Sequence, residues 1–205
     1  MGSSRANGGT GRFLFLEPLY KQKQMFYTVG EYLREGGNRM RARQESCCFT
    51  GHRPAKLPWR YDEADPRCLI LKGRIRDTVE IAYEQGYRHF LCGMAQGCDL
   101  YFCEAVLALR ERCPDVTLEA AIPCPSQADS WPAAQRERYA RLVAACDYET
   151  MVSAAYSSSC MLRRDRYMVD HASMLIAAFD GSSGGTRYTV EYALKRGLSI
   201  VDLPI

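Results

Sequence analysis

The sequence predicts an α/β protein: a single doubly wound, Rossmann-like domain whose mostly parallel sheet of about six strands carries helices on both faces. Two observations predict this fold. From Ser46 onward, short apolar runs alternate with longer amphipathic runs, the pattern of buried parallel strands joined by helices. The length of 205 residues fits one substantial core better than two. Right-handed crossovers between successive strands then make the sheet doubly wound.

The strands are predicted from short apolar runs bounded by turns. The first is SCCFT, and the most apolar is SMLIAAF, which the turn DGSSGG follows directly. Their length and lack of alternation are typical of strands covered on both faces. The predicted strands are 46–50, 88–93, 116–122, 149–153, 173–179 and 198–202.

The helices are predicted from apolar spacing and from residues that start or stop a helix. Leu71, Ile75 and Val79 recur at helical spacing, and Gly86 follows that run as a C-terminal stop. Pro132 falls in the first turn of the third helix, a position that tolerates proline. The predicted helices are 67–85, 98–112, 131–145, 160–172 and 186–196.

Residues 1–45 have a different composition from residues 46–205. Several glycines interrupt any periodicity, although a helix between about Phe13 and Arg34 is an alternative. We interpret this segment as an N-terminal extension that is either flexible or upstream of a true start at Met40. It carries eight Lys and Arg against four Asp and Glu, whereas residues 46–205 carry 19 against 20. The near-neutral domain gives no support for nucleic acid as a partner.

Composition also bears on location and on metal binding. No apolar run approaches the roughly 20 residues that span a bilayer, which predicts a cytoplasmic protein with no membrane partner. Ten cysteines occur without any CxxC pair or zinc-type spacing, so we expect no metal site. Most lie in apolar runs and are predicted to be buried, reduced thiols. Examples are Cys47, Cys92, Cys103 and Cys146.

Three glycine-bearing turns connect predicted strands to predicted helices: TGHRP (50–54), GMAQGCD (93–99) and DGSSGGT (180–186). In a doubly wound sheet such turns share the carboxyl edge, where ligands bind near the point at which strand order reverses. Free amides at helix N-termini favour an anion there, and phosphate is the natural occupant. The spacings match neither GxGxxG nor GxxxxGK[ST], which argues against a dinucleotide dehydrogenase and a P-loop ATPase.

The candidate ligand-binding residues come from these turns and from the arginines of the fourth helix. For several of them a structural role is the alternative: His52 as a turn residue, Asp99 as a helix N-cap rather than a ribose acceptor, and the arginines as a solvated face. The candidates are Thr50, Gly51, His52, Arg53, Gly93, Met94, Gly97, Asp99, Arg163, Ser183, Gly184, Gly185 and Thr186.

Four segments in order carry a resemblance to a known family. They are CCFTGHRPAKLPW, CGMAQGCDLYFCEAV, AAIPCPSQADSW and MLRRDRYMVDHASMLIAAFDGSSGGTRYTVEYA. Together they resemble the YpsA-like branch of the SLOG superfamily over nearly all of residues 46–205. The resemblance implies a Rossmann-like domain that binds a nucleotide or a nucleotide derivative, with no settled reaction. More distant relatives include LOG-type phosphoribohydrolases and DprA-type proteins, which bind single-stranded DNA.

The resemblance also suggests a catalytic pair. In the LOG pattern an arginine before the last glycine loop and a glutamate soon after PGGxGT carry catalysis, which points to Arg166 and Glu191 here. The sequence departs from that pattern, because SSGGT lacks the proline and Glu191 comes five residues after Thr186. This departure favours binding over a LOG-type reaction.

Three functions follow from the sequence. The first is binding or sensing of a small nucleotide ligand, such as an ADP-ribose-like compound, by a domain that would suit a homodimer. The second is hydrolysis of a glycosidic or phosphate-linked bond in such a ligand, with Arg166 on the phosphate and Glu191 or Asp99 at the ribose. The third is binding of single-stranded nucleic acid.

Overall fold

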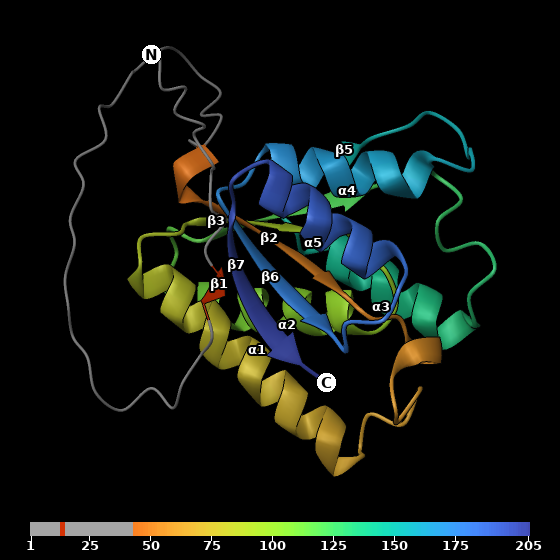
Figure 1. The fold of residues 1–205 in the computed structure, drawn as a ribbon. Coiled ribbons are helices and arrows are strands. Elements are labelled where there is room, and N and C mark those ends of the chain that lie inside the picture. The colour runs from red at the N-terminus through yellow and green to blue at the C-terminus, as the bar shows by residue number, and fades with distance from the viewer. Residues whose placement is uncertain (1–12, 15–42) are drawn as a thin grey trace, which may run out of the picture.

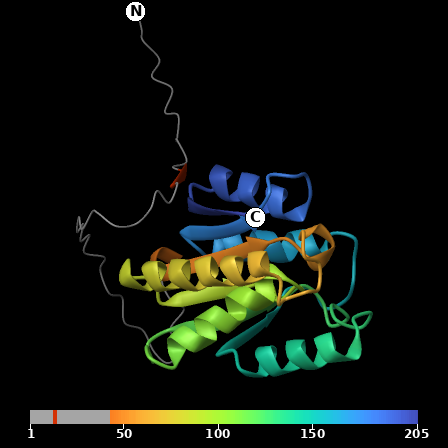
Figure 2. The same ribbon diagram turned by 90° about the horizontal axis from the view of Figure 1, so that it is seen from below.

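The computed structural model describes residues 13–14 and 43–205, which fold into the three layers of an α/β sandwich (Figure 1). Helices α1 and α2 lie on one side of the sheet and α5 on the other when the molecule is turned (Figure 2). The core residues divide in the same way. Those of α1, α2 and α3 form one cluster, and those of α4 and α5 form another. The predicted fold class is confirmed.

All six predicted strands and five predicted helices are present, with boundaries shifted by a few residues. None of the helices within residues 43–205 has the length and apolar content needed to cross a membrane. The strands are Phe13–Leu14 (β1), Ser46–Gly51 (β2), His89–Cys92 (β3), Thr117–Ile122 (β4), Tyr148–Met151 (β5), Met174–Phe179 (β6) and Ser199–Pro204 (β7). The helices are Pro66–Glu84 (α1), Cys98–Arg110 (α2), Ala133–Ala144 (α3), Cys160–Asp170 (α4) and Gly185–Lys195 (α5).

Strand β1 was not predicted. Phe13 and Leu14 pair in parallel with Ile200 and Val201 of β7. These two residues therefore extend the sheet, where the sequence suggested a helix as one alternative. The rest of the predicted extension, up to residue 42, lies outside the described residues, and its role stays a prediction.

The strand order is β1-β7-β6-β2-β3-β4-β5, and every neighbouring pair is parallel. From β2 the chain proceeds through β3 and β4 to β5 on one side. It then crosses back, so that β6 pairs with the other side of β2. The order therefore reverses between β2 and β6. This is the point where open α/β sheets bind their ligands, beyond the carboxyl ends of the strands.

The two faces of the sheet differ in how they are filled. On the α1–α2–α3 face, the rings of Phe49 and Phe102 stack with centroids 4.6 Å apart, and Phe90 packs beside them. The buried residues of the α4–α5 face are aliphatic or sulfur-containing, and some of them, such as Cys48 and Ala177, are small. All ten cysteines fall in the described residues as free thiols, and eight are buried.

Candidate functional site

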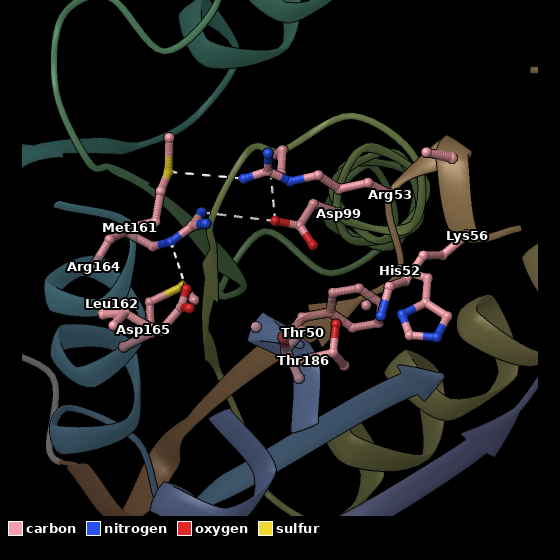
Figure 3. Close-up of a pocket in the computed structure, with 16 residues that line it drawn as sticks. Thr50, His52, Arg53, Lys56, Asp99, Met161, Leu162, Arg164, Asp165 and Thr186 are labelled. Carbon is pink, nitrogen blue, oxygen red and sulfur yellow. Dashed lines mark hydrogen bonds and ion pairs between the residues drawn. The ribbon is translucent and has the colours of Figure 1, made fainter. Parts of the chain in front are cut away.

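A cavity of about 380 Å³ opens at the carboxyl end of β2, on the α4–α5 side of the sheet (Figure 3). Its walls come from segments far apart in the sequence: the end of β2 and the turn after it, the start of α2, the first three turns of α4 and the first residues of α5. This is the predicted position, because the strand order reverses between β2 and β6.

One wall consists of hydrogen-bond donors without a partner in the described structure. The residues Thr50 and Thr186 are 7% and 9% exposed, and within residues 43–205 their hydroxyls make no side-chain hydrogen bond and remain accessible from the cavity. Helix α5 begins at Gly185, and its N-cap, Gly184, supplies no capping side chain. The first amides of α5 are therefore left to face whatever lies in the cavity.

The opposite wall holds a buried cluster of charges. Arg164, 5% exposed, places Nε 2.8 Å from Oδ1 of Asp165 and Nη1 3.7 Å from Oδ2 of Asp99 (Figure 3). Burial works to lower the pKa of Arg164, but the carboxylates of Asp165 and Asp99 outweigh it and raise that pKa. The guanidinium therefore stays charged and holds both carboxylates at the cavity.

Asp99 is the more unusual member of this cluster. Burial raises the pKa of its carboxyl to about 6, although Arg164 and the amide of Ala95 act in the opposite direction. The amide donates to Oδ2 of Asp99 over 3.1 Å. Asp99 was considered as a helix N-cap, but Gly97 occupies that position in α2. Asp99 instead lines the cavity. There its carboxyl group can accept a hydrogen bond, and with a pKa of about 6 it changes charge near neutral pH.

Gly93 leaves the space that the guanidinium of Arg164 occupies. The Nη1 group of Arg164 donates to the carbonyl oxygen of Gly93. A Cβ atom added to Gly93 would collide with the same guanidinium. A glycine is therefore required at position 93, because a side chain there would displace the guanidinium of Arg164.

Two cations stand at the mouth of the cavity. The guanidinium of Arg53 extends over Asp99 towards Met161, whose sulfur lies 3.8 Å from Nη2 (Figure 3). Lys56, in the 3₁₀ turn Pro54–Lys56 (η2), reaches across to the loop after β6. Its Nζ donates to Oγ of Ser182 over 3.2 Å and to the carbonyl oxygen of Ser183.

His52 joins two of the three glycine turns. Its ring is 2% exposed, and Nε2 lies 2.7 Å from Oδ1 of Asp180. This hydrogen bond and those from Ser182 hold the pKa of Asp180 well below its usual range. The backbone of His52 also bonds to Ala178 and Cys98. The imidazole is therefore engaged by the loop after β6, although part of the residue lines the cavity.

Seven of the thirteen candidate ligand-binding residues line the cavity and six do not. Among the six, Met94 is fully buried in the core, and its carbonyl oxygen accepts from Gln127 over 2.7 Å. Those that line it are Thr50, Gly51, His52, Arg53, Asp99, Gly185 and Thr186. Those that do not are Gly93, Met94, Gly97, Arg163, Ser183 and Gly184.

Arg166 and Glu191, the candidate catalytic pair, both lie outside the cavity. Nε of Arg166 donates to the hydroxyl of Tyr188 over 2.6 Å. Glu191 is exposed and accepts from Arg187 over 3.0 Å, as an i,i+4 pair along α5. The geometry does not bring the two groups together at the site, and their catalytic role stays a prediction.

Sequence reasoning did not single out several residues that line the cavity. All but two of the larger ones lie on α4, where Met161, Asp165 and Met168 share one helical face with Arg164 beside it. The helical spacing of these α4 residues could be recognised in the sequence. Their face mixes charged and apolar residues, however, and so lacks the apolar pattern of a helix face that packs in the core. The larger residues concerned are Phe49, Lys56, Met161, Leu162, Arg164, Asp165 and Met168.

Comparison with known proteins defines the family. A family model described as the YspA SLOG family (YpsA) matches residues 47–199. This chain belongs to the YpsA family of SLOG proteins. An uncharacterized SPbeta prophage-derived protein, YoqJ of Bacillus subtilis, is 31% identical over 145 residues, which are 64% of this chain and 84% of YoqJ. The UPF0398 protein YpsA of the same organism is 24% identical over 151 residues, 72% of this chain and 83% of YpsA.

Solved structures agree with the fold. DNA processing protein A (DprA) from Streptococcus pneumoniae superposes with a TM-score of 0.54 at 14% identity, over 79% of this chain and 51% of that protein. The chain thus spans about half the length of that DprA. DprA from Helicobacter pylori, studied for its single-stranded DNA binding mode, gives 0.53 at 15% identity over 81% and 67% of the chains. At these identities the likeness concerns the fold alone.

Proposed function

We propose that this protein binds a nucleotide or nucleotide derivative in the cavity at the carboxyl end of β2, with a phosphate at the N-terminus of α5. The observation that carries the proposal is the wall of unpartnered donors. The hydroxyls of Thr50 and Thr186 and the first amides of α5 line the same cavity. Hydroxyls and the free amides of a helix N-terminus can all donate to an anion, so an acceptor with several oxygens suits this wall.

The remaining walls suit the rest of a nucleotide. Asp99 offers a carboxylate oxygen to a ribose hydroxyl, and Arg164 fixes its orientation. Met161, Leu162 and Met168 provide apolar surface on which a base would pack. The volume of about 380 Å³ lies at the small end of the roughly 300–1,000 Å³ typical of ligand sites, which favours a single nucleotide unit.

Hydrolysis of the ligand is supported less well. Of the groups suggested for it, Asp99 lies in the cavity, whereas Arg166 and Glu191 do not line it. A general acid or base has to come within hydrogen-bond reach of the reacting group. In this arrangement a glycosidase reaction would depend on Asp99 and Asp165 instead of the predicted pair.

Single-stranded DNA is the second candidate, because the DprA of Helicobacter pylori, whose fold is similar, binds single-stranded DNA. The 19 basic and 20 acidic residues of the domain from 46 to 205 count against it. Binding of nucleic acid depends on phosphate contacts to a concentrated positive surface and weakens steeply with salt. Affinity for an oligonucleotide that falls strongly between low and high salt would favour this candidate over a small ligand.

The test is a thermal-shift screen of the full chain against nucleoside monophosphates, ADP-ribose, NAD and cyclic nucleotides. A compound at a hundred times its dissociation constant should stabilise the protein by about 2.7 kcal/mol, a rise of several degrees in melting temperature. Gly185→Asp should abolish the shift, because a carboxylate would then face the phosphate position. Glu191→Gln, outside the cavity, should retain it. A panel without any shift would contradict the proposal.

A further inference from the structure

Among the described residues, Lys56 is the one lysine that lines the cavity. The turn that carries it follows β2 directly, and its side chain crosses to the loop after β6, between Asp180 and α5. There its ammonium bonds to two oxygens, Oγ of Ser182 and the carbonyl oxygen of Ser183. Both partners are neutral acceptors on an exposed loop, so within residues 43–205 no carboxylate forms an ion pair with this cation.

The ammonium also lies against the start of α5. Gly184, the N-cap, has a φ of +144°, and a Cβ built on it would come within 2.9 Å of Nζ of Lys56. A full positive charge is therefore placed beside the partial positive charge of a helix N-terminus. Two like charges held together with no anion between them are unfavourable, and an anion at this point would relieve both.

We propose that Lys56 selects ligands with a terminal phosphate, by exchanging its hydrogen bonds from Ser182 and Ser183 to the phosphate oxygens. The inference rests on the nucleotide-binding function proposed above and adds a residue and a mechanism to it. Hydrogen bonds between ionised partners are roughly twice as strong as bonds to neutral acceptors, so the exchange is favourable. The group recognised is a phosphate monoester dianion, and the uncharged nucleoside lacks it.

The exchange has a structural consequence for the loop after β6. Two side chains of the turn after β2 tie this loop: the ammonium of Lys56 contacts Ser182 and Ser183, and the imidazole of His52 contacts Asp180 and Ser182. Phosphate would remove the first and leave the second. Ser183 would thereby lose its contact with Lys56 beside the cavity mouth, while Ser182 stays bonded to Asp180 and His52, which gives the chain a way to report occupancy of the site.

The experiment compares variants of the full chain by titration with inorganic phosphate and with AMP. Lys56→Gln should raise the dissociation constant for both by about tenfold or more, because one charged hydrogen bond is lost. Lys56→Arg keeps the charge and should recover most of the affinity. Lys72→Gln is the matched control, since Lys72 pairs with Glu63 away from the cavity and should leave binding unchanged.

The outcomes separate this inference from the function on which it rests. If wild type binds phosphate or AMP and folded Lys56→Gln binds equally well, the role of Lys56 is wrong while the site stands. If Lys56→Arg is as weak as Lys56→Gln, charge is not what Lys56 supplies, and the inference is overturned. If the wild-type chain binds neither compound, both the site and the role of Lys56 are rejected. Melting temperatures of the variants establish that each is folded.

Discussion

The two faces of the sheet differ in how their space is filled. On the α1–α2–α3 face, Phe49, Phe90 and Phe102 fill the space between strands and helices. On the α4–α5 face, the carboxyl end of the sheet is left open and is lined by threonines and by the Arg164 cluster. The aromatic core and the candidate site thus lie mostly on opposite sides of the same strands and meet at Phe49 and at the start of α2, so a change on one face that avoids this junction should leave the other largely intact.

Strand β2 shows how one short segment serves both faces. Successive side chains of a strand point to opposite sides, so Phe49 enters the aromatic core while its neighbours Cys48 and Thr50 face α4 and α5. Thr50 is the last such residue before the glycine turn. A shift of one residue in the register of β2 would bring the phenyl ring into the cavity and the hydroxyl into the core.

The largest effect is expected on the filled face. Phe102→Ala removes a fully buried ring that stacks on Phe49, which should lower the free energy of unfolding by about 3–5 kcal/mol. Chemical denaturation measures that loss. Phosphate affinity, measured at low temperature on the folded variant, should change by less than about twofold because Phe102 itself does not line the cavity. A parallel loss of phosphate affinity would show that the aromatic core and the cavity are energetically coupled.

An intermediate effect is expected at Asp99, with a characteristic pH dependence. The folded-state pKa of about 6 lies above that of an exposed aspartate, so the folded chain keeps a proton that the unfolded chain has released. The stability contributed by this group is full below about pH 4 and is lost as pH rises through about 6. Relative to Asp99→Asn, the wild type should therefore lose up to about 3 kcal/mol between pH 4 and 7.

Denaturation of both proteins at several pH values tests this expectation. The aspartate and asparagine side chains have nearly the same shape, so the comparison isolates ionisation. A difference in stability that is constant with pH would mean that Asp99 is not held in a desolvated position beside Arg164.

The smallest effect is expected from a matched pair of threonines on the two faces. Thr50→Val removes an unpartnered hydroxyl from the cavity wall. It should change stability by less than about 1 kcal/mol and weaken phosphate binding about fivefold. Thr78→Val removes a hydroxyl that donates to the carbonyl oxygen of Arg74 within α1 over 2.8 Å. It should leave phosphate affinity unchanged. If isothermal titration showed that Thr78→Val weakens phosphate binding more than Thr50→Val does, the site would lie on the α1–α2–α3 face.

The fold could be predicted because it depends on averages over many residues. An apolar run such as SMLIAAF predicts a buried strand independently of the residues around it. The glycine turns indicate the carboxyl edge of the sheet. The position of the cavity followed from the same pattern, since it lies where the strand order reverses.

The inward-facing residues of α4 could not be predicted in the same way. Arg163, Arg164 and Arg166 lie within four positions, and each step along a helix turns a side chain by about 100°. Which arginine is buried depends on where the helix starts, at Cys160, and on the space that Gly93 leaves beneath it. Both depend on tertiary contacts, so the sequence pattern alone could not distinguish Arg164, which lines the cavity, from its two neighbours.

The central claim is that the open end of the α4–α5 face binds a phosphate-bearing nucleotide. The most direct measurement is a titration of the isotope-labelled full chain with AMP and with ADP-ribose, followed by backbone amide NMR. We expect saturable shifts concentrated at Thr50, Arg164, Gly185 and Thr186, with little change at Phe90 and Phe102 in the aromatic core. Shifts centred elsewhere, or none at millimolar concentrations of either nucleotide, would contradict it.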